Sequence, residues 1–254
     1  MEADEYRKLA EVEDQMWYFA ALHGHLERSL RNGGGMERPG QGLDAGCGTG
    51  GFLRTIRARF PDWRWQGLDY EPLAVELARQ RSGTQIVQGS VEQLPYADGE
   101  FDAVTSADVL YHVDDDIRAL QEFHRVLRPG GMVVINVPAY MWLWSYHDVA
   151  VHSRRRYGRT EVQRKLADAG FAEIHTTFWN MLPLPLVVAR RKLWPAPKSA
   201  SDVHVFSPRV EAAFRWMMRR EDSWLRQGRS LPAGSSILAV ARRASHTRSP
   251  TKLD

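Results

Sequence analysis

Gly42-Leu43-Asp44-Ala45-Gly46-Cys47-Gly48-Thr49-Gly50-Gly51 is the stretch that decides the fold of this chain. A short apolar run ends at an acid and breaks into glycines, and the residues that follow, 52–56, predict a helix. The pattern is that of a strand, a tight turn and a helix N-terminus. Glycine lets the backbone take a positive φ and come close to a ligand. Such turns bind nucleotides at the carboxyl ends of strands in open α/β sheets.

Asp44 distinguishes between the two nucleotide ligands that this turn could bind. The glycines fit G-x-G-x-x-G, the dinucleotide pattern, which is weak evidence alone. A carboxylate at Asp44 would repel the pyrophosphate of NAD and attract the ammonium and sulfonium groups of S-adenosylmethionine (SAM). Roughly 20 residues further on, residues 65–70 predict a second strand that ends at Asp69. Asp69 is placed to accept hydrogen bonds from ribose hydroxyls, which both ligands carry.

Ordered sequence blocks between residues 41 and 138 resemble a known family. They are residues 43–50, 67–69, 89–96, 101–104, 106–113 and 125–131. Together they resemble the motifs of class I SAM-dependent methyltransferases, in the subgroup often compared with ubiquinone/menaquinone C-methyltransferases. The resemblance implies a doubly wound, Rossmann-like α/β fold with a seven-stranded, mostly parallel sheet and an antiparallel last strand. It also implies SAM as the cofactor and S-adenosylhomocysteine (SAH) as the product.

The same resemblance implies a cofactor site built from the first four strands. Ser90 departs from the family pattern, because many relatives have Asp there near the adenine. Cys47 lies in the glycine turn, where a small residue permits close approach; a nucleophilic thiol is the alternative. The implied cofactor-binding residues are Asp44, Gly46, Cys47, Gly48, Asp69, Tyr70, Ser90, Val91, Ala107 and His112.

Aromatic and basic residues crowd two segments that we expect to face the acceptor molecule. Residues 13–23 resemble an N-terminal pattern of the subgroup, although Trp17 and Phe19 could simply dock their helix on the core. Residues 139–159 follow the fifth predicted strand, and their three arginines could hold a phosphate or carboxylate or form a solvated charge run. The substrate-binding candidates are Trp17, Tyr18, His23, Tyr111, Trp144, His152, Arg155, Tyr157 and Asn180.

A catalytic base is needed only if the acceptor atom belongs to a hydroxyl or an amine. Histidine suits this task, since its ordinary pKa is near 6.5. We favour His147, with His112 and Tyr146 as further catalytic candidates; the alternative for His147 is a packing or hydrogen-bonding role. No second carboxylate cluster accompanies His147 and His152, so no metal is expected.

Composition sets broader bounds on the protein. Its 254 residues predict one α/β domain with insertions, which the resemblance implies is a single methyltransferase domain over 1–254. The single cysteine suits a reducing cytoplasm. A net charge of +3 does not by itself indicate a nucleic-acid partner. The sequence lacks the Asn/Asp-Pro-Pro-aromatic motif that would indicate RNA methylation. No apolar run is long enough to span a membrane. Residues 182–192, apolar and then basic, are either a contact with a membrane or lipid-like substrate or a buried connection under the next helix. We expect a monomer or a homodimer.

Alternation of strand and helix organises the chain into regions. We expect a helical cap over 1–35 whose helix, 4–31, is broken once, a SAM-binding core over 36–138, a substrate side with a helical insertion over 139–234, the last strand over 235–242 and a flexible tail over 243–254. The predicted helices are 51–60, 72–81, 115–127, 160–169 (with Thr160 as N-cap) and 208–226, and a loop is expected around 195–201. The predicted strands are 63–68, 84–88, 101–106, 132–137, 172–179 and 235–240.

The sequence therefore predicts a SAM-dependent methyltransferase. The expected acceptor is an O, N or C atom of a small hydrophobic or aromatic molecule, such as a natural-product intermediate. Two alternatives stay open: a SAM-binding protein that does not transfer methyl groups, and a nicotinamide-dependent oxidoreductase.

Overall fold

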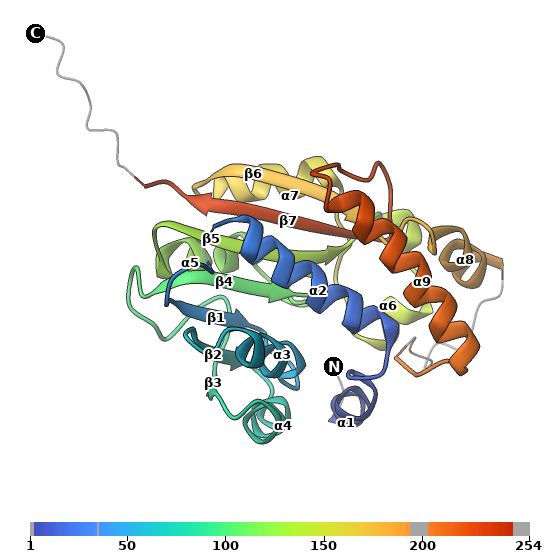
Figure 1. The fold of residues 1–254 in the computed structure, drawn as a ribbon, viewed down its shortest axis with the longest axis horizontal. Helices are drawn as coiled ribbons and strands as arrows, with labels where there is room; N and C mark the ends of the chain where they lie inside the picture. Colours follow the sequence, from blue (N-terminus) through green and yellow to red (C-terminus); the bar gives the residue numbers. More distant parts are fainter. Residues whose placement is uncertain (1–2, 35, 194–202, 246–254) are drawn as a thin grey trace, which may run out of the picture.

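A computed structural model describes residues 3–34, 36–193 and 203–245. The loop expected around 195–201 and the tail beyond residue 245 lie outside the described residues. A seven-stranded sheet runs through the molecule in the order β3-β2-β1-β4-β5-β7-β6, with helices on both faces (Figure 1). The predicted Rossmann-like α/β fold is confirmed. Among the described helices, none is long and apolar enough to cross a membrane.

The sheet is parallel from β3 to β5 and antiparallel around β7. The last strand of the chain, β7, lies between β5 and β6, so that β6 forms the edge. The central strands are buried on both sides, as continuous apolar runs in parallel strands require. The strands are β1 (Gln41–Ala45), β2 (Arg64–Asp69), β3 (Gln85–Gln88), β4 (Phe101–Ala107), β5 (Leu127–Pro138), β6 (Phe171–Trp179) and β7 (Ser236–Arg243).

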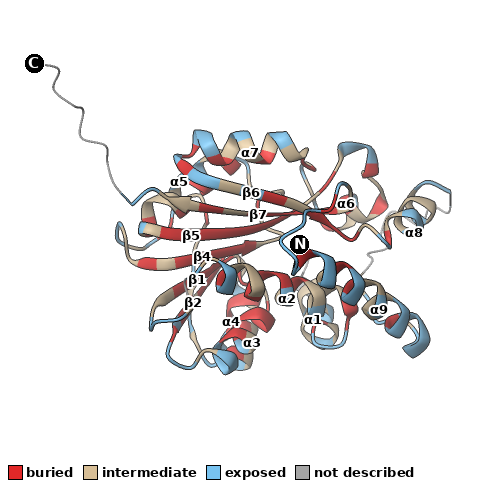
Figure 2. Ribbon diagram, turned by 45° about the horizontal axis from the view of Figure 1, so that its top comes forward, coloured by how far each residue is buried: buried red, intermediate tan, exposed pale blue. Residues whose placement is uncertain are grey.

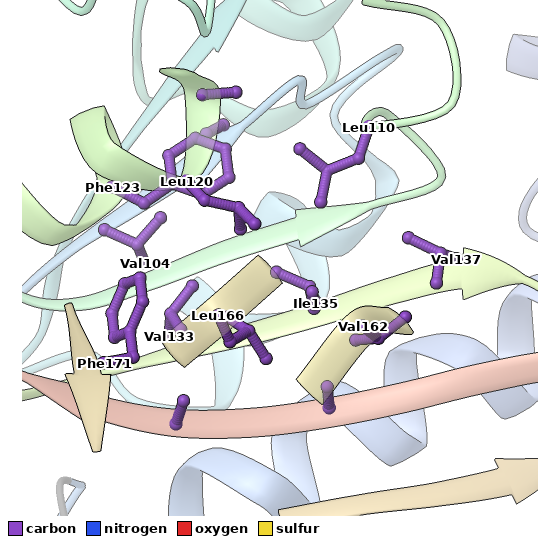
Figure 3. Close-up of a cluster of buried hydrophobic side chains, with 14 of the residues drawn as sticks. Val104, Leu110, Leu120, Phe123, Val133, Ile135, Val137, Val162, Leu166 and Phe171 are labelled. Carbon is purple, nitrogen blue, oxygen red and sulfur yellow. The ribbon is translucent and has the colours of Figure 1, made fainter. Parts of the chain in front are cut away.

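Two hydrophobic clusters, one on each face, hold the helices on the sheet. On one face, Phe123 of α5 (Asp116–Val126) and Leu166 of α7 (Arg159–Asp168) pack with Val104 and Ile135 of the central strands (Figure 3). On the other face lie α2, α3 (Gly51–Arg59), α4 (Pro72–Ser82) and α9 (Pro208–Leu225). The buried residues follow the sheet and the inward sides of these helices (Figure 2).

The N-terminal cap is broken once, as predicted, into α1 (Ala3–Val12) and α2 (Trp17–Asn32). Leu26 and Leu30 of α2 are fully buried, so this helix belongs to the core. After β5 the chain adds a short 3-10 turn, η1 (Met141–Leu143), and α6 (Tyr146–Ala150). After β6 it adds α8 (Leu184–Val188) and a π-helical turn, η2 (Ala189–Leu193).

Some predicted boundaries and packing assignments are wrong for local reasons. β5 begins at Leu127, not at residue 132, because Leu127 pairs with Phe101 and Gly130 takes a φ of +82°. The N-cap of α7 is Gly158, not Thr160: the Glu161 carboxylate accepts a hydrogen bond from the Gly158 N–H at 3.2 Å. Residues 182–192 are not a buried connection, since α8 has no buried residue.

Candidate functional site

Three acids follow three neighbouring strands at the same edge of the sheet. Asp44 lies near the end of β1, Asp69 ends β2, and Asp108 directly follows β4. These strands are parallel, so their carboxyl ends meet. A cavity of about 1200 Å³ lies over this edge, and all three carboxylates line it.

The glycine turn between β1 and α3 forms the floor of the cavity. Gly46 has a φ of +84°, and a Cβ there would lie 2.2 Å from Cγ2 of Val109. A larger residue is therefore excluded both by conformation and by space. The Gly48 N–H donates to Oδ2 of Asp69 at 2.8 Å, and the Glu71 N–H donates to Oδ1 at 3.0 Å. These bonds fix the Asp69 carboxylate beside the turn.

Burial makes the acids at this edge receptive to a cation. It raises the pKa of Asp44 to about 7, although the Thr105 hydroxyl donates to its Oδ1 at 2.7 Å and opposes the shift. Burial also raises the pKa of Asp69, although the backbone hydrogen bonds to its carboxylate oppose the shift. A carboxylate with a raised pKa lacks a compensating positive charge. The residues present therefore fit a ligand that brings positive charge and ribose hydroxyls to this edge.

The helical cap closes the cavity from the side of the turn. Tyr6 and Leu9 of α1 line it. Between α1 and α2, the buried Glu13 carboxylate accepts hydrogen bonds from the Thr49 hydroxyl at 2.6 Å and from Nη1 of Arg81 at 2.7 Å. We call Glu13, Thr49 and Arg81 the cap latch. It joins the linker of the cap to the glycine turn and to α4.

A partly buried chain of hydrogen bonds joins the cap to the sheet at Asp108. The Tyr18 hydroxyl donates to Oδ2 of Asp108 at 2.8 Å, and the Asn136 amide donates to Oδ1 at 2.9 Å. Nε1 of Trp179 donates to the Asn136 carbonyl oxygen at 2.7 Å. Asp108 has a φ of +59°, a conformation that costs free energy outside glycine. Burial raises its pKa to about 6.

The cavity brings most of the predicted site residues together. All ten implied cofactor residues line it. Other predicted residues also line it: Trp17, Tyr18 and His23 from the cap, Tyr111 after β4, His147 and His152 from the segment after β5, and Asn180 after β6. Burial lowers the pKa of His112 to about 4 and also lowers that of His23, so both imidazoles are neutral near pH 7. Within the described residues, no three His, Cys, Asp or Glu side chains are grouped so as to hold a metal ion.

Four predicted site residues have other contacts and do not line the cavity. Nη2 of Arg155 donates to the carbonyl oxygens of residues 113 and 114, and Nη1 lies 3.2 Å from the Asp116 carboxylate. The Tyr157 hydroxyl lies 2.9 Å from the same carboxylate, and its side chain is buried. Tyr146 lies under the Arg190 guanidinium at 5.4 Å, and the Trp144 carbonyl oxygen accepts from Lys192. These contacts hold the segment after β5 in place.

The sequence analysis missed several residues that line the cavity, among them Glu13, Asp108 and Phe214, whereas Arg156 is one of the three arginines that it did consider. Asp108 follows a buried strand as Asp69 does, so the same pattern could have found it. Phe214 stacks on Trp17 with ring centroids 4.6 Å apart. That contact joins α2 to α9, and no local sequence pattern predicts it.

A family model described as a methyltransferase domain matches residues 43–135, which carry the glycine turn and the three acids. The match indicates a class I SAM-dependent methyltransferase domain over these residues. SAM is therefore the cofactor that this methyltransferase's turn and its buried acids fit.

Known proteins resemble this methyltransferase over part of their length. The demethylmenaquinone methyltransferase of Deinococcus radiodurans is 37% identical over 102 residues, 38% of this chain and 42% of that protein. The malonyl-[acyl-carrier protein] O-methyltransferase of Serratia marcescens is 40% identical over 109 residues, 42% of each. The chain thus spans 42% of the length of each of these two relatives.

A solved structure shows the same fold over most of this chain. It is geranyl diphosphate C-methyltransferase from Streptomyces coelicolor A3(2), in complex with Mg²⁺, geranyl diphosphate and SAH. The TM-score is 0.59 at 18% identity, covering 87% of this chain and 79% of that one. At this identity the likeness concerns the fold alone.

Proposed function

We propose that this chain transfers the methyl group of SAM to an O, N or C atom of a small acceptor with a large apolar or aromatic surface. The size and continuity of the cavity carry the proposal. Its volume of about 1200 Å³ exceeds the range of about 300–1,000 Å³ that is usual for a single ligand pocket. It runs from Asp44 and Asp69 to the aromatic side chains of α2, so it has room for a cofactor and an acceptor together.

The two ends of the cavity differ in chemistry. The end at the glycine turn is acidic and suits the cofactor, which supplies an activated methyl group. The other end has apolar walls, which include Trp17 of the cap, Phe214 of α9 and Phe206 just before α9. Such walls exclude water and orient an apolar acceptor, which is the main task of the protein when the methyl group is already activated.

Tests of this function begin with the cofactor. Calorimetric titration should give micromolar binding of SAM and SAH to the wild-type chain, and Asp69→Ala should abolish it. Asp62→Ala, which removes an exposed acid between α3 and β2, is the matched control and should bind normally. Acceptors are then screened by SAH release. Binding of NAD in place of SAM and SAH would favour the oxidoreductase, and SAH binding without SAH release from any acceptor would favour a SAM-binding protein.

His147 is the proposed base for a hydroxyl or amine acceptor. It lines the cavity from α6, whereas His112, with a pKa of about 4, is a weak base near pH 7. Removing a general base typically costs about 10²–10⁴-fold in rate. We therefore expect His147→Ala to lower the rate of SAH release by at least about 100-fold with SAH affinity unchanged. Near-normal turnover in this variant would show that His147 is not the base.

A further inference from the structure

Asp108 presents a carboxylate to the cavity between its acidic end and its aromatic end. The residue directly follows β4, and β4 is the neighbour in the sheet of β1, which carries Asp44. On its other side the carboxylate touches Tyr18 of the cap, whose ring centroid lies 5.9 Å from that of Trp17. In the proposed function the methyl group passes from the cofactor at the acidic end to an acceptor at the aromatic end, so Asp108 lies where the two meet.

The side chains that hold this carboxylate are neutral. Its Oδ2 accepts from the Tyr18 hydroxyl and its Oδ1 from the Asn136 amide, and no described residue forms an ion pair with it. The positive charge of Arg156 lowers the pKa of Asp108, but burial outweighs this effect and raises the pKa to about 6. The Arg156 guanidinium itself is paired with Asp148 at 2.6 Å. A cation bound beside Asp108 would therefore be stabilised by a carboxylate that has no other cation in contact.

A second acceptor atom on the cavity wall lacks a donor. The side chain of Asn180 is buried and lines the cavity, and its Oδ1 accepts no hydrogen bond from any described residue. Asn180 follows Trp179, whose Nε1 donates to Asn136 in the chain of hydrogen bonds that holds Asp108. A buried oxygen without a donor costs free energy, so such atoms are normally satisfied by a partner or a ligand. A ligand that carries N–H donors would supply what both oxygen groups can accept.

Aromatic rings are the other feature of this part of the cavity. Trp17, Tyr18, Tyr111 and Phe214 line it, and Trp17 stacks on Phe214. Aromatic faces attract cations electrostatically and pack against apolar groups. The Asp108 carboxylate, in contrast, would repel an anionic nucleophile such as a phenolate or an enolate. Carboxylate and rings together therefore favour a nitrogen that gains positive charge over an oxygen or carbon nucleophile that starts as an anion.

We propose that the acceptor is a primary or secondary amine with an apolar or aromatic body, and that Asp108 binds an N–H of its amino group. This proposal rests on the proposed methyl transfer, since it names the atom that is methylated.

The proposed step moves positive charge toward Asp108. The lone pair of the neutral amine forms the new N–C bond while the S–C bond of SAM breaks, and the electron pair of that bond stays on sulfur. The positive charge thus passes from sulfur to nitrogen, where the Asp108 carboxylate stabilises it as it develops. The methylated nitrogen then gives its extra proton to the base, which is His147 in the proposed function.

The test measures binding of three simple probes to the full chain in the presence of saturating SAH, whose sulfur carries no charge. Phenethylamine, phenethyl alcohol and hydrocinnamate share one aromatic body and differ in the charge of the polar group. They are titrated by calorimetry near neutral pH, where the amine is protonated and hydrocinnamate is an anion. A charge-assisted hydrogen bond favours the ammonium by about tenfold or more over the alcohol. We expect this preference, with hydrocinnamate the weakest of the three.

Variants assign the preference to the charge of Asp108. Asp108→Asn keeps the size of the side chain, and asparagine tolerates the positive φ of +59° at this position. It should lower phenethylamine affinity about tenfold and leave phenethyl alcohol binding unchanged. Asp114→Asn is the matched control, because it removes the same charge from an exposed acid of the same cavity, and should keep the preference. Tyr18→Phe removes a donor to Asp108 without removing the charge, and should keep the preference as well.

Three results would overturn the proposal. The first is binding of the alcohol or of hydrocinnamate to the wild-type chain as tightly as the amine, a comparison that decides even if Asp108→Asn does not fold. The second is an amine preference that survives in Asp108→Asn. The third is a loss of SAH affinity in folded Asp108→Asn with the amine preference intact, which would assign Asp108 to the amino group of the cofactor. Absence of SAH binding to the wild-type chain would instead contradict the proposed function, so the two failures are distinct.

Discussion

Asp44 occupies a position in which its charge depends on what binds beside it. Without a ligand, burial holds its pKa near 7, compared with an ordinary value of about 3.9. A pKa raised on folding means that the group stabilises the ligand-free fold at low pH, and that this stability is lost as the pH rises toward 7. A cationic ligand would lower the pKa of Asp44 again, because it interacts favourably with the ionised carboxylate.

This coupling predicts the pH dependence of SAM binding. Below pH 7, SAM has to displace the proton of Asp44, so SAM affinity should rise with pH up to about 7 and then level off, with up to about tenfold change per pH unit. Calorimetry at pH 6.5 in buffers of different ionisation enthalpy should detect proton release on binding. Asp44→Asn should bind SAM more weakly and release no proton at this pH; proton release of wild-type size in that variant would assign the titration to another group.

Tyr18 tests the hydrogen-bonded chain at Asp108. Tyr18→Phe removes the hydroxyl that donates to the partly buried Asp108 carboxylate and leaves the ring in place. Loss of a hydrogen bond to a charged group costs about 1.5–3 kcal/mol, and urea denaturation should show a loss of this order. Tyr70→Phe, at a side chain that is 75% exposed, is the control and should change the stability by less than about 0.5 kcal/mol.

Single residues also show where sequence reasoning reaches its limit at the site. Asp44 and Asp69 could be predicted because each follows a short apolar run beside a glycine or a turn. The same pattern precedes Asp108, but its partners Tyr18 and Asn136 are 90 and 28 residues away along the chain. Only the packed sheet and cap bring them together, so the network could not be found from local patterns.

Among the elements, the cap has a defined attachment to the core. The cap latch ties the linker between α1 and α2 to the glycine turn and α4. Arg54 and Arg81 add ion pairs with Asp14 at 2.6 and 3.1 Å. Because α1 itself lines the cavity, the latch also determines how firmly the cavity is covered.

Glu13→Gln should loosen α1 without unfolding the sheet. The substitution removes the charge opposite Arg81 and keeps an oxygen that the Thr49 hydroxyl can reach, so a loss of about 1–3 kcal/mol in stability is expected. Amide hydrogen exchange of residues 3–12 should accelerate, and SAH affinity should fall. Glu11→Gln, at an exposed position of α1, should leave both unchanged. Unaltered exchange in Glu13→Gln would mean that the latch does not hold α1.

The boundaries of helices and strands could be predicted where a local sequence signal determines them. The predictions were wrong where pairing between strands determines them. Pro72 opens α4 as its sequence suggests, since proline suits a first helical turn. The start of β5 was misjudged because its first residues pair with β4 across a bulge. Residues 130–131 look like a helix stop followed by a turn, yet they belong to a strand.

At the scale of the whole molecule, the alternation of strands and helices and the ordered motifs were enough to predict the sheet, including its antiparallel last strand. The contents of the acceptor end were not predictable. They depend on α9, which packs on α2 through Phe214 and Trp17, and whose Glu211 carboxylate accepts a hydrogen bond from the Trp17 N–H at 2.9 Å. These contacts join residues that are 194 or more positions apart. Neither segment has a sequence pattern that predicts its contact with the other.

One cavity shared by the cap, the sheet and α9 makes ligand binding a property of the whole fold. Unfolding any of these parts destroys the site, so SAH should stabilise the entire chain in one transition. At 100 times its dissociation constant, a ligand that binds only the folded state adds about 2.7 kcal/mol. For a chain of this size, each kcal/mol raises the melting temperature by about 2–4 °C, so a rise of about 5–11 °C is expected by scanning calorimetry. Asp69→Ala should show no rise, because it lacks the ribose acceptor. Two separate transitions, of which SAH shifts only one, would mean that the cap or α9 unfolds independently of the sheet.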